Sequence, residues 1–168
     1  HVHQLIDSAH FHELKEAGIA FGPLTPTFSV GAVKFFADGS LGGRTAWMSQ
    51  PYLDRPTEKG LAQYQDEELA QLVEAVVAHN FPAAVHAIGD AAAEQVIDVF
   101  AQHSPRRGRH RLVHAQLVRP DLVKRLALLP DLSVDIQPRF VVSDFPWVLE
   151  ALGEERLRYG YAWRSLFA

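Results

Sequence analysis

The chain has 168 residues, of which 48% are hydrophobic and 21% charged, with 16 basic and 20 acidic side chains. This length and hydrophobic content suit one domain with a buried core. The formal charge of −4 argues against nucleic acid or an anionic membrane as a partner, and the absence of cysteine excludes disulfides, thiolate metal sites and a cysteine nucleophile. No run approaches the roughly 20 apolar residues of a membrane span, so we expect a cytoplasmic protein.

Short β-rich runs alternate along the chain with segments of helical period. The chain opens at His1, inside such a run and without a start methionine, so we expect an internal piece of a longer protein. A connection over residues 40–65 is rich in glycine, proline and polar side chains and is expected to be an insertion. The expected strands cover 2–6, 30–37, 83–88, 111–117 and 132–137, and the expected helices 8–17, 66–80, 90–102, 120–129 and 146–152.

This alternation predicts an α/β fold with parallel strands, outer helices and right-handed crossovers. Strands that start mostly 20 to 30 residues apart fit (β/α) barrel units of about 30 residues, and they equally fit a doubly wound sheet. A closed eight-stranded barrel needs about 250 residues, so the barrel interpretation makes residues 1–168 a single partial TIM-barrel domain. A nucleotide-binding version of the doubly wound sheet lacks support, because no Gly-x-Gly-x-x-Gly or Walker-type loop follows a strand.

Three expected strands carry an ionisable side chain toward the carboxyl end, where the sites of α/β proteins are built. These side chains are Lys34, His86 and His114. Each also has a simpler interpretation, because a strand histidine is more often a hydrogen-bonded core residue than a ligand, and Lys34 can pair with Asp38 on the same face. The coincidence across three strands favours a shared site, while spacing alone leaves metal binding and a structural role both open.

The glycine-rich string around Asp38-Gly39-Ser40-Leu41-Gly42-Gly43-Arg44-Thr45-Ala46 resembles the amidohydrolase superfamily, and within it the YtcJ-like branch that includes N-substituted formamide deformylases. Order and spacing agree from about Val30 to the end of the chain. The further matching motifs are His86-Ala87-Ile88-Gly89-Asp90, His114-Ala115-Gln116-Leu117, Gln137-Pro138, Ser143-Asp144 and Tyr161-Ala162-Trp163-Arg164-Ser165-Leu166.

The resemblance implies a metal-dependent (β/α)8 barrel that hydrolyses non-peptide C–N (amide) bonds of small molecules with metal-activated water. It makes Lys34, His86 and His114 the metal ligands of the fourth, fifth and sixth strands, so that the chain holds about strands three to seven. Zinc is the expected divalent ion, although imidazole also suits iron, nickel and copper. Because an ammonium cannot ligate a cation, Lys34 would be neutral or carboxylated to a carbamate. The expected substrate-binding residues are Asp38, Gln116 and Arg164.

Two parts of the family pattern are expected outside this chain: the His-x-His of the first strand and the general-base aspartate of the eighth. His1 and His3 lie too close to Lys34 to be that pair and are expected to be an ordinary strand end. We therefore expect a fragment that is inactive alone and self-associates through exposed strand edges. The alternative is a non-catalytic α/β regulatory or interaction module that keeps the scaffold; stoichiometric metal on His86 and His114 would favour the enzyme.

Overall fold

A six-stranded sheet runs through the molecule, whose computed structural model describes residues 1–166. The parallel strands follow the order β1-β3-β4-β5-β6, and β2 pairs with β3 in the antiparallel sense. Each strand after β3 joins the same side of the sheet, without the reversal of order that defines a doubly wound fold. The strands are β1 (Val2–Asp7), β2 (Gly22–Thr25), β3 (Phe28–Phe36), β4 (Ala83–Ala87), β5 (His110–His114) and β6 (Leu132–Asp135).

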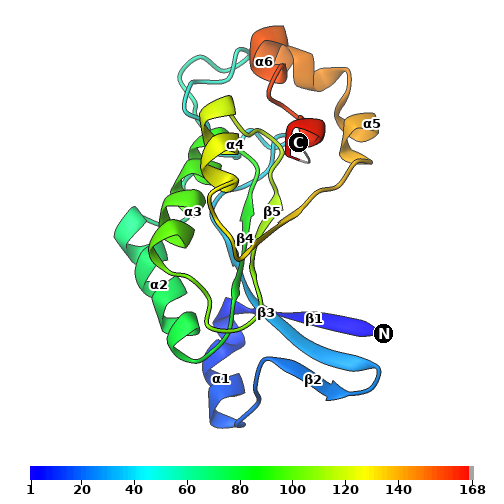
Figure 1. Cartoon of the computed structure of the whole chain (residues 1–168). Helices are drawn as coiled ribbons and strands as arrows, with labels where there is room; N and C mark the ends of the chain where they lie inside the picture. The colour runs from blue at the N-terminus through cyan, green and yellow to red at the C-terminus, as the bar shows by residue number, and fades with distance from the viewer. Residues whose placement is uncertain (167–168) are drawn as a thin grey trace.

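Helices cover one side of this sheet. Figure 1 shows α2, α3 and α4 side by side along the strands, with α5, α6 and the C-terminus gathered at the carboxyl ends of β4 and β5. The helical elements are η1 (Ser8–His10), α1 (Phe11–Glu16), α2 (Asp66–Ala78), α3 (Asp90–Gln102), α4 (Pro120–Leu126), α5 (Phe140–Asp144), α6 (Trp147–Leu157) and α7 (Trp163–Leu166). No helix among residues 1–166 combines the length and the apolar character that crossing a bilayer requires.

The main hydrophobic core lies between the helices and one face of the sheet. The apolar stripe of α2 is buried through Leu69, Val73 and Val76, which pack in the same cluster as Val33 and Phe35 of β3. Apolar residues at helical spacing on one side and at alternate strand positions on the other thus meet, as their periods predict. The α/β fold and the partial barrel expected from the sequence are confirmed.

The segment between Ala37 and Gln65 contains no helix or strand in the described structure, yet it is well packed. Its buried side chains form a second core together with α6. This core includes Leu41, Ala46, Met48, Tyr52, Val148, Ala151 and Leu152. The Tyr52 hydroxyl donates to the carbonyl of Ala46 (2.7 Å), and the amide of Leu53 donates to the carbonyl of Ala151 (2.8 Å). The segment is therefore held onto α6 at the end of the sheet where the strands finish.

Several elements differ from the sequence expectations: α5 and α7 were not expected, and β6 ends at Asp135 rather than at residue 137. Strand β2 was not expected, because it is four residues long and includes Pro23, a residue confined to sheet edges. The strand expected over 111–117 ends at His114, because the backbones of His114 and Ala115 are left-handed, with φ of 76° and 46°. Ala115 and Leu117, which were expected in this strand, therefore lie beyond its end.

Candidate functional site

Lys34, His86 and His114 come from three adjacent strands and lie near one another at the carboxyl end of the sheet. The rings of His86 and His114 are 4.5 Å apart between centroids and meet edge to face. The Phe36 ring lies 5.3 Å from the His86 ring, and the Lys34 Nζ lies 3.9 Å from the centroid of Phe36. The three residues selected from the sequence therefore belong to one row of side chains.

The direction of the His114 side chain depends on its unusual backbone. In a regular strand, His114 would share a face with Leu112, and Leu112 packs in the helix-covered core. Its register partner would be Ala87 rather than His86. The φ of 76° rotates the side chain out of this alternation, so that it meets His86 instead. The His114 side chain therefore leaves the face that regular strand alternation would give it.

Each imidazole has one nitrogen held by an acceptor, which defines where its lone pair lies. His86 Nε2 lies 2.8 Å from the carbonyl oxygen of Gly39, which can only accept, so this nitrogen carries the proton and Nδ1 keeps the lone pair. His114 Nδ1 lies 2.7 Å from Oε1 of Gln137. The Gln137 amide is oriented by donation from its Nε2 to the carbonyl of Asp135 (3.3 Å), so His114 Nδ1 is the donor and Nε2 keeps the lone pair.

The environment shifts the pKa of two of the three residues downward, toward the neutral form. Burial, together with the nearby His86 and Lys34, lowers the pKa of His114 to about 4, so this imidazole is neutral at pH 7. Burial also lowers the pKa of Lys34 to about 8, against the opposing effect of Asp38. A neutral imidazole can ligate a metal, and a lysine with a lowered pKa has a larger neutral fraction available for reaction.

Asp38 has a fully buried side chain and binds backbone groups of two segments. Its carboxylate accepts hydrogen bonds from the amides of Trp47 (2.9 Å), Ile88 (3.1 Å) and Gly89 (2.8 Å). It also lies 3.2 Å from His86 Nε2. Lys34 instead donates to the carbonyl of Phe35 (2.9 Å), so the described residues do not form the simple Lys34–Asp38 ion pair. Asp38 therefore positions His86 and the two segments around it.

Gln116 forms a buried polar cluster with two residues that were not selected as site residues. Its Nε2 donates to Asp144 Oδ2 (2.7 Å) and to the Tyr161 hydroxyl (2.9 Å), and Tyr161 donates to the same Asp144 oxygen (2.6 Å). Both added residues lie in matching motifs, which was the available sequence indication. Arg164 is exposed on α7, so it does not share the enclosed setting of this cluster.

These residues fit part of a metal site. Two imidazole nitrogens with free lone pairs and one lysine of lowered pKa are nitrogen ligands that divalent transition metals accept. Carbonyl and amide acceptors hold the opposite ring nitrogens, as is usual behind metal-binding histidines. Among residues 1–166, no three His, Cys, Asp or Glu side chains are grouped to hold an ion, so the imidazoles need Lys34 or further ligands.

Comparison with known proteins gives a consistent family. Residues 2–168 match the model of the amidohydrolase family. The chain is 44% identical over 144 residues to YtcJ of Bacillus subtilis (strain 168), a protein named as an amidohydrolase, and 33% identical over 142 residues to the protein LONG AFTER FAR-RED 3 of Arabidopsis thaliana. These matches cover 85% and 82% of this chain but only 27% and 24% of the relatives, so the chain spans about a quarter of their length.

Two solved structures are also similar. They are uncharacterized metal-dependent hydrolases from Pyrococcus furiosus and Pyrococcus horikoshii OT3. Each superposes with a TM-score of 0.88 over 97% of this chain, at 33% and 34% sequence identity, and the match covers 34% and 32% of those proteins. This chain is therefore similar in both fold and sequence to about a third of each solved chain.

Proposed function

We propose that this chain, which belongs to the amidohydrolase family, contributes the lysine–histidine part of the metal centre of a hydrolase that cleaves non-peptide C–N (amide) bonds of small molecules. By family it is a metal-dependent hydrolase. The observation that carries the proposal is the pair of imidazoles, with ring centroids 4.5 Å apart, each with one nitrogen held by an acceptor. We further propose that the ion is zinc, which metal analysis would check. We also propose that the protein is cytoplasmic, which cell fractionation would check.

Each residue has a defined part in this proposal. His86 and His114 would hold the ion through Nδ1 and Nε2, with Lys34 as a further ligand beside them. A divalent cation at such a site lowers the pKa of water and polarises a substrate carbonyl. Asp38 keeps His86 in one orientation, and Gln116 with its polar cluster is proposed to contact the polar part of the substrate. Arg164 remains a candidate for substrate contact from the exposed face of α7.

Removal of either imidazole is expected to weaken metal binding. His86→Ala and His114→Ala should each reduce Zn²⁺ affinity by more than about tenfold, because each removes a ligand nitrogen that a neighbour has already oriented. Isothermal titration with Zn²⁺ measures this, and exposed His12→Ala is the matched control. Equal losses in all three variants would contradict the site. In the natural protein that carries this chain, His86→Ala should also abolish amine release from an N-substituted amide.

Lys34 is proposed to be carboxylated. The lone pair of neutral Nζ attacks the carbon of CO₂, one N–H proton passes to solvent, and the product is a carbamate anion whose two oxygens can bridge two ions. Native mass spectrometry in bicarbonate is expected to show a mass gain of one CO₂ that Lys34→Arg lacks and that Lys59→Arg, a substitution outside the site, retains. The carbamate is contradicted if Lys34→Arg shows the same mass gain as Lys59→Arg. It is also contradicted if the parent protein shows no mass gain.

The 168-residue chain alone is proposed to be inactive and to self-associate. Its described part groups His86 and His114 with Lys34 and with no further His, Cys, Asp or Glu side chain placed to hold an ion, which is about half of the ligand set that the family pattern implies. The edge strands β1 and β6 each pair on one side only, and such edges tend to pair with other chains. Analytical ultracentrifugation should show dimers or larger species that grow with concentration. A monomer at all concentrations that releases amine from amides would overturn both statements.

A further inference from the structure

Arg156 is the most deeply buried arginine of the chain, with 7% of its surface exposed. Four other arginines are shielded from solvent, and each of them pairs with a carboxylate. These pairs are Arg44–Asp54, Arg111–Asp135, Arg119 with Asp90, Glu94 and Asp121, and Arg125–Asp98. No carboxylate among the described residues lies within 4.0 Å of the Arg156 guanidinium. Among these five arginines, the most buried one therefore lacks the carboxylate partner that each of the other four has.

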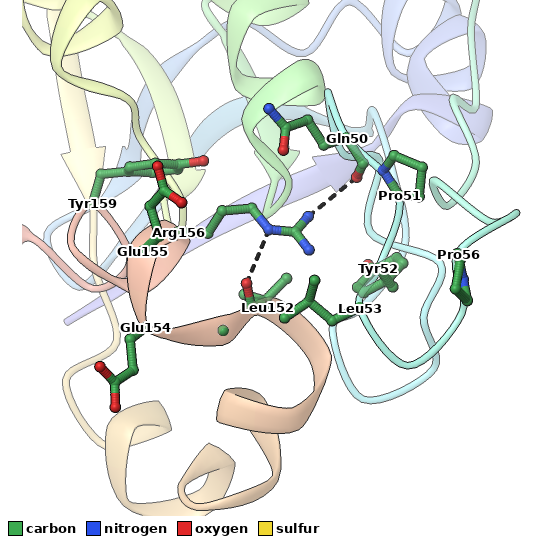
Figure 2. A pocket seen from close by; sticks show the side chains of 11 residues that line it. Gln50, Pro51, Tyr52, Leu53, Pro56, Leu152, Glu154, Glu155, Arg156 and Tyr159 are labelled. Carbon is green, nitrogen blue, oxygen red and sulfur yellow. Dashed lines mark hydrogen bonds between the residues drawn. The ribbon is translucent and has the colours of Figure 1, made fainter.

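Arg156 lies at the wall of a hollow of about 780 Å³ between residues 50–56 and 152–159. Its Nε donates to the carbonyl of Leu152 (3.0 Å) and its Nη1 to the carbonyl of Gln50 (3.2 Å). Figure 2 shows the guanidinium reaching between these two residues into the hollow. A guanidinium has five N–H donors, and these two hydrogen bonds use two of them.

The two carbonyls give Arg156 a structural part but do not account for its charge. They link the 40–65 segment to α6, as the hydrogen bond from the Leu53 amide to the Ala151 carbonyl also does. A neutral glutamine or a tyrosine could donate to carbonyls as well. Only 7% of the surface of Arg156 is exposed, and the guanidinium N–H groups that no carbonyl accepts open onto the hollow, where an anion would stabilise the charge. The remaining N–H groups therefore favour an anionic ligand.

We propose that this hollow binds a small organic monocarboxylate through the free edge of Arg156. A planar guanidinium and a planar carboxylate form two parallel hydrogen bonds. The apolar side chains of Leu53 and Leu152 line the same hollow and would contact a short hydrocarbon body. Glu154 and Glu155 also line it and repel an anion with two charges, such as phosphate, more strongly than a monocarboxylate. The site uses none of the residues of the proposed metal centre.

Butyrate tests the proposal on the chain freed of metal with a chelator, so that carboxylate binding to a metal is excluded. Titration followed by ¹H–¹⁵N spectra is expected to saturate in the low millimolar range, with shifts confined to residues 50–56 and 152–159. Butyramide, which has nearly the same shape and no charge, should bind at least tenfold more weakly. Inorganic phosphate should also bind more weakly than butyrate.

A pair of surface substitutions separates binding from folding. Leu53→Glu places a negative charge in the hollow and is expected to reduce butyrate affinity at least tenfold. Leu61→Glu is the control, because Leu61 is equally exposed at 58% and lies outside the hollow. Both variants should retain the parent's circular dichroism spectrum, since both side chains face solvent. Equal binding of butyrate and butyramide, shifts around His86 and His114, or an unchanged affinity in Leu53→Glu would overturn the proposal.

Discussion

Replacement of Gly89 by alanine is expected to lower the free energy of unfolding by about 3 kcal/mol, the upper end of the usual cost of overpacking. A Cβ at this position would lie 1.9 Å from the carbonyl oxygen of Trp47 and 2.4 Å from its carbonyl carbon. Both atoms belong to the backbone, so the steric clash can be relieved only if the 40–65 segment moves. The Gly89 amide also donates to Asp38 (2.8 Å), so the same movement disturbs the carboxylate beside His86.

Gly42→Ala is the matched control for this substitution. Gly42 lies in the same segment, but the nearest atom to its added Cβ is 3.9 Å away, on the Trp147 ring. We expect a change within about 0.5 kcal/mol. Urea denaturation of the three proteins measures both effects, provided that the dependence on urea concentration is the same in each. If Gly89→Ala is as stable as Gly42→Ala, the close approach of Gly89 to Trp47 is wrong.

His110 is expected to make the stability of the chain fall in acid. It is buried at the start of β5, where its Nδ1 accepts from the amide of Ala83 (3.0 Å) and its Nε2 donates to the carbonyl of His103 (2.5 Å). Its ring stacks on Phe100, with 4.3 Å between centroids. A protonated ring could no longer accept from Ala83, and burial lowers the pKa of His110 below 6.5. Only the neutral ring fits the folded chain.

The direction of the pH effect follows from this lowered pKa. Above pH 6.5 the ring is neutral in both the folded and unfolded states, so its contribution to stability is complete. Below pH 6.5 the unfolded chain binds a proton that the folded chain refuses, and stability falls by at most about 1.4 kcal/mol per pH unit until the lowered folded pKa is reached. His114, whose pKa is also lowered, adds a loss in the same direction.

His110→Gln isolates the part that belongs to His110. At pH 8 it should cost about 2 kcal/mol, because the hydrogen bonds and the stacking are impaired. At pH 5 this cost should be smaller. The parent has by then lost the part of its stability that depends on a neutral His110, and the variant has no imidazole at this position to lose it from. Denaturation curves at both pH values measure the difference, with exposed His12→Gln as the control. A cost that is the same at pH 5 and pH 8 would contradict a neutral, buried ring.

Periodicity was sufficient to predict the parallel strands and the main helices, because apolar spacing records which face is buried. The stripe of Leu69 and Val73 is of this kind, whereas Lys34 and His86 were selected from their places near strand ends and from the family resemblance. The position of His114 was not predictable in the same way, since its φ of 76° is set by packing and no glycine marks it. The contacts of Asp38 with Ile88 and Gly89 join residues about 50 positions apart, and no local pattern reports such a distance.

Because His114 and Ala115 have left-handed backbones, the direction of the side chain at position 114 does not follow from the pairing register of its strand. The Ala115 amide still donates to Ala87 (3.2 Å), and the Leu117 amide to Ile88 (3.1 Å), so the chain stays beside β4 after the turn. The residue at position 114 is therefore aimed by the backbone rather than by alternation. A carboxylate or a thiol introduced there would face His86 as the imidazole does. Ligand chemistry at this position can thus be exchanged, by evolution or by design, without rebuilding the sheet.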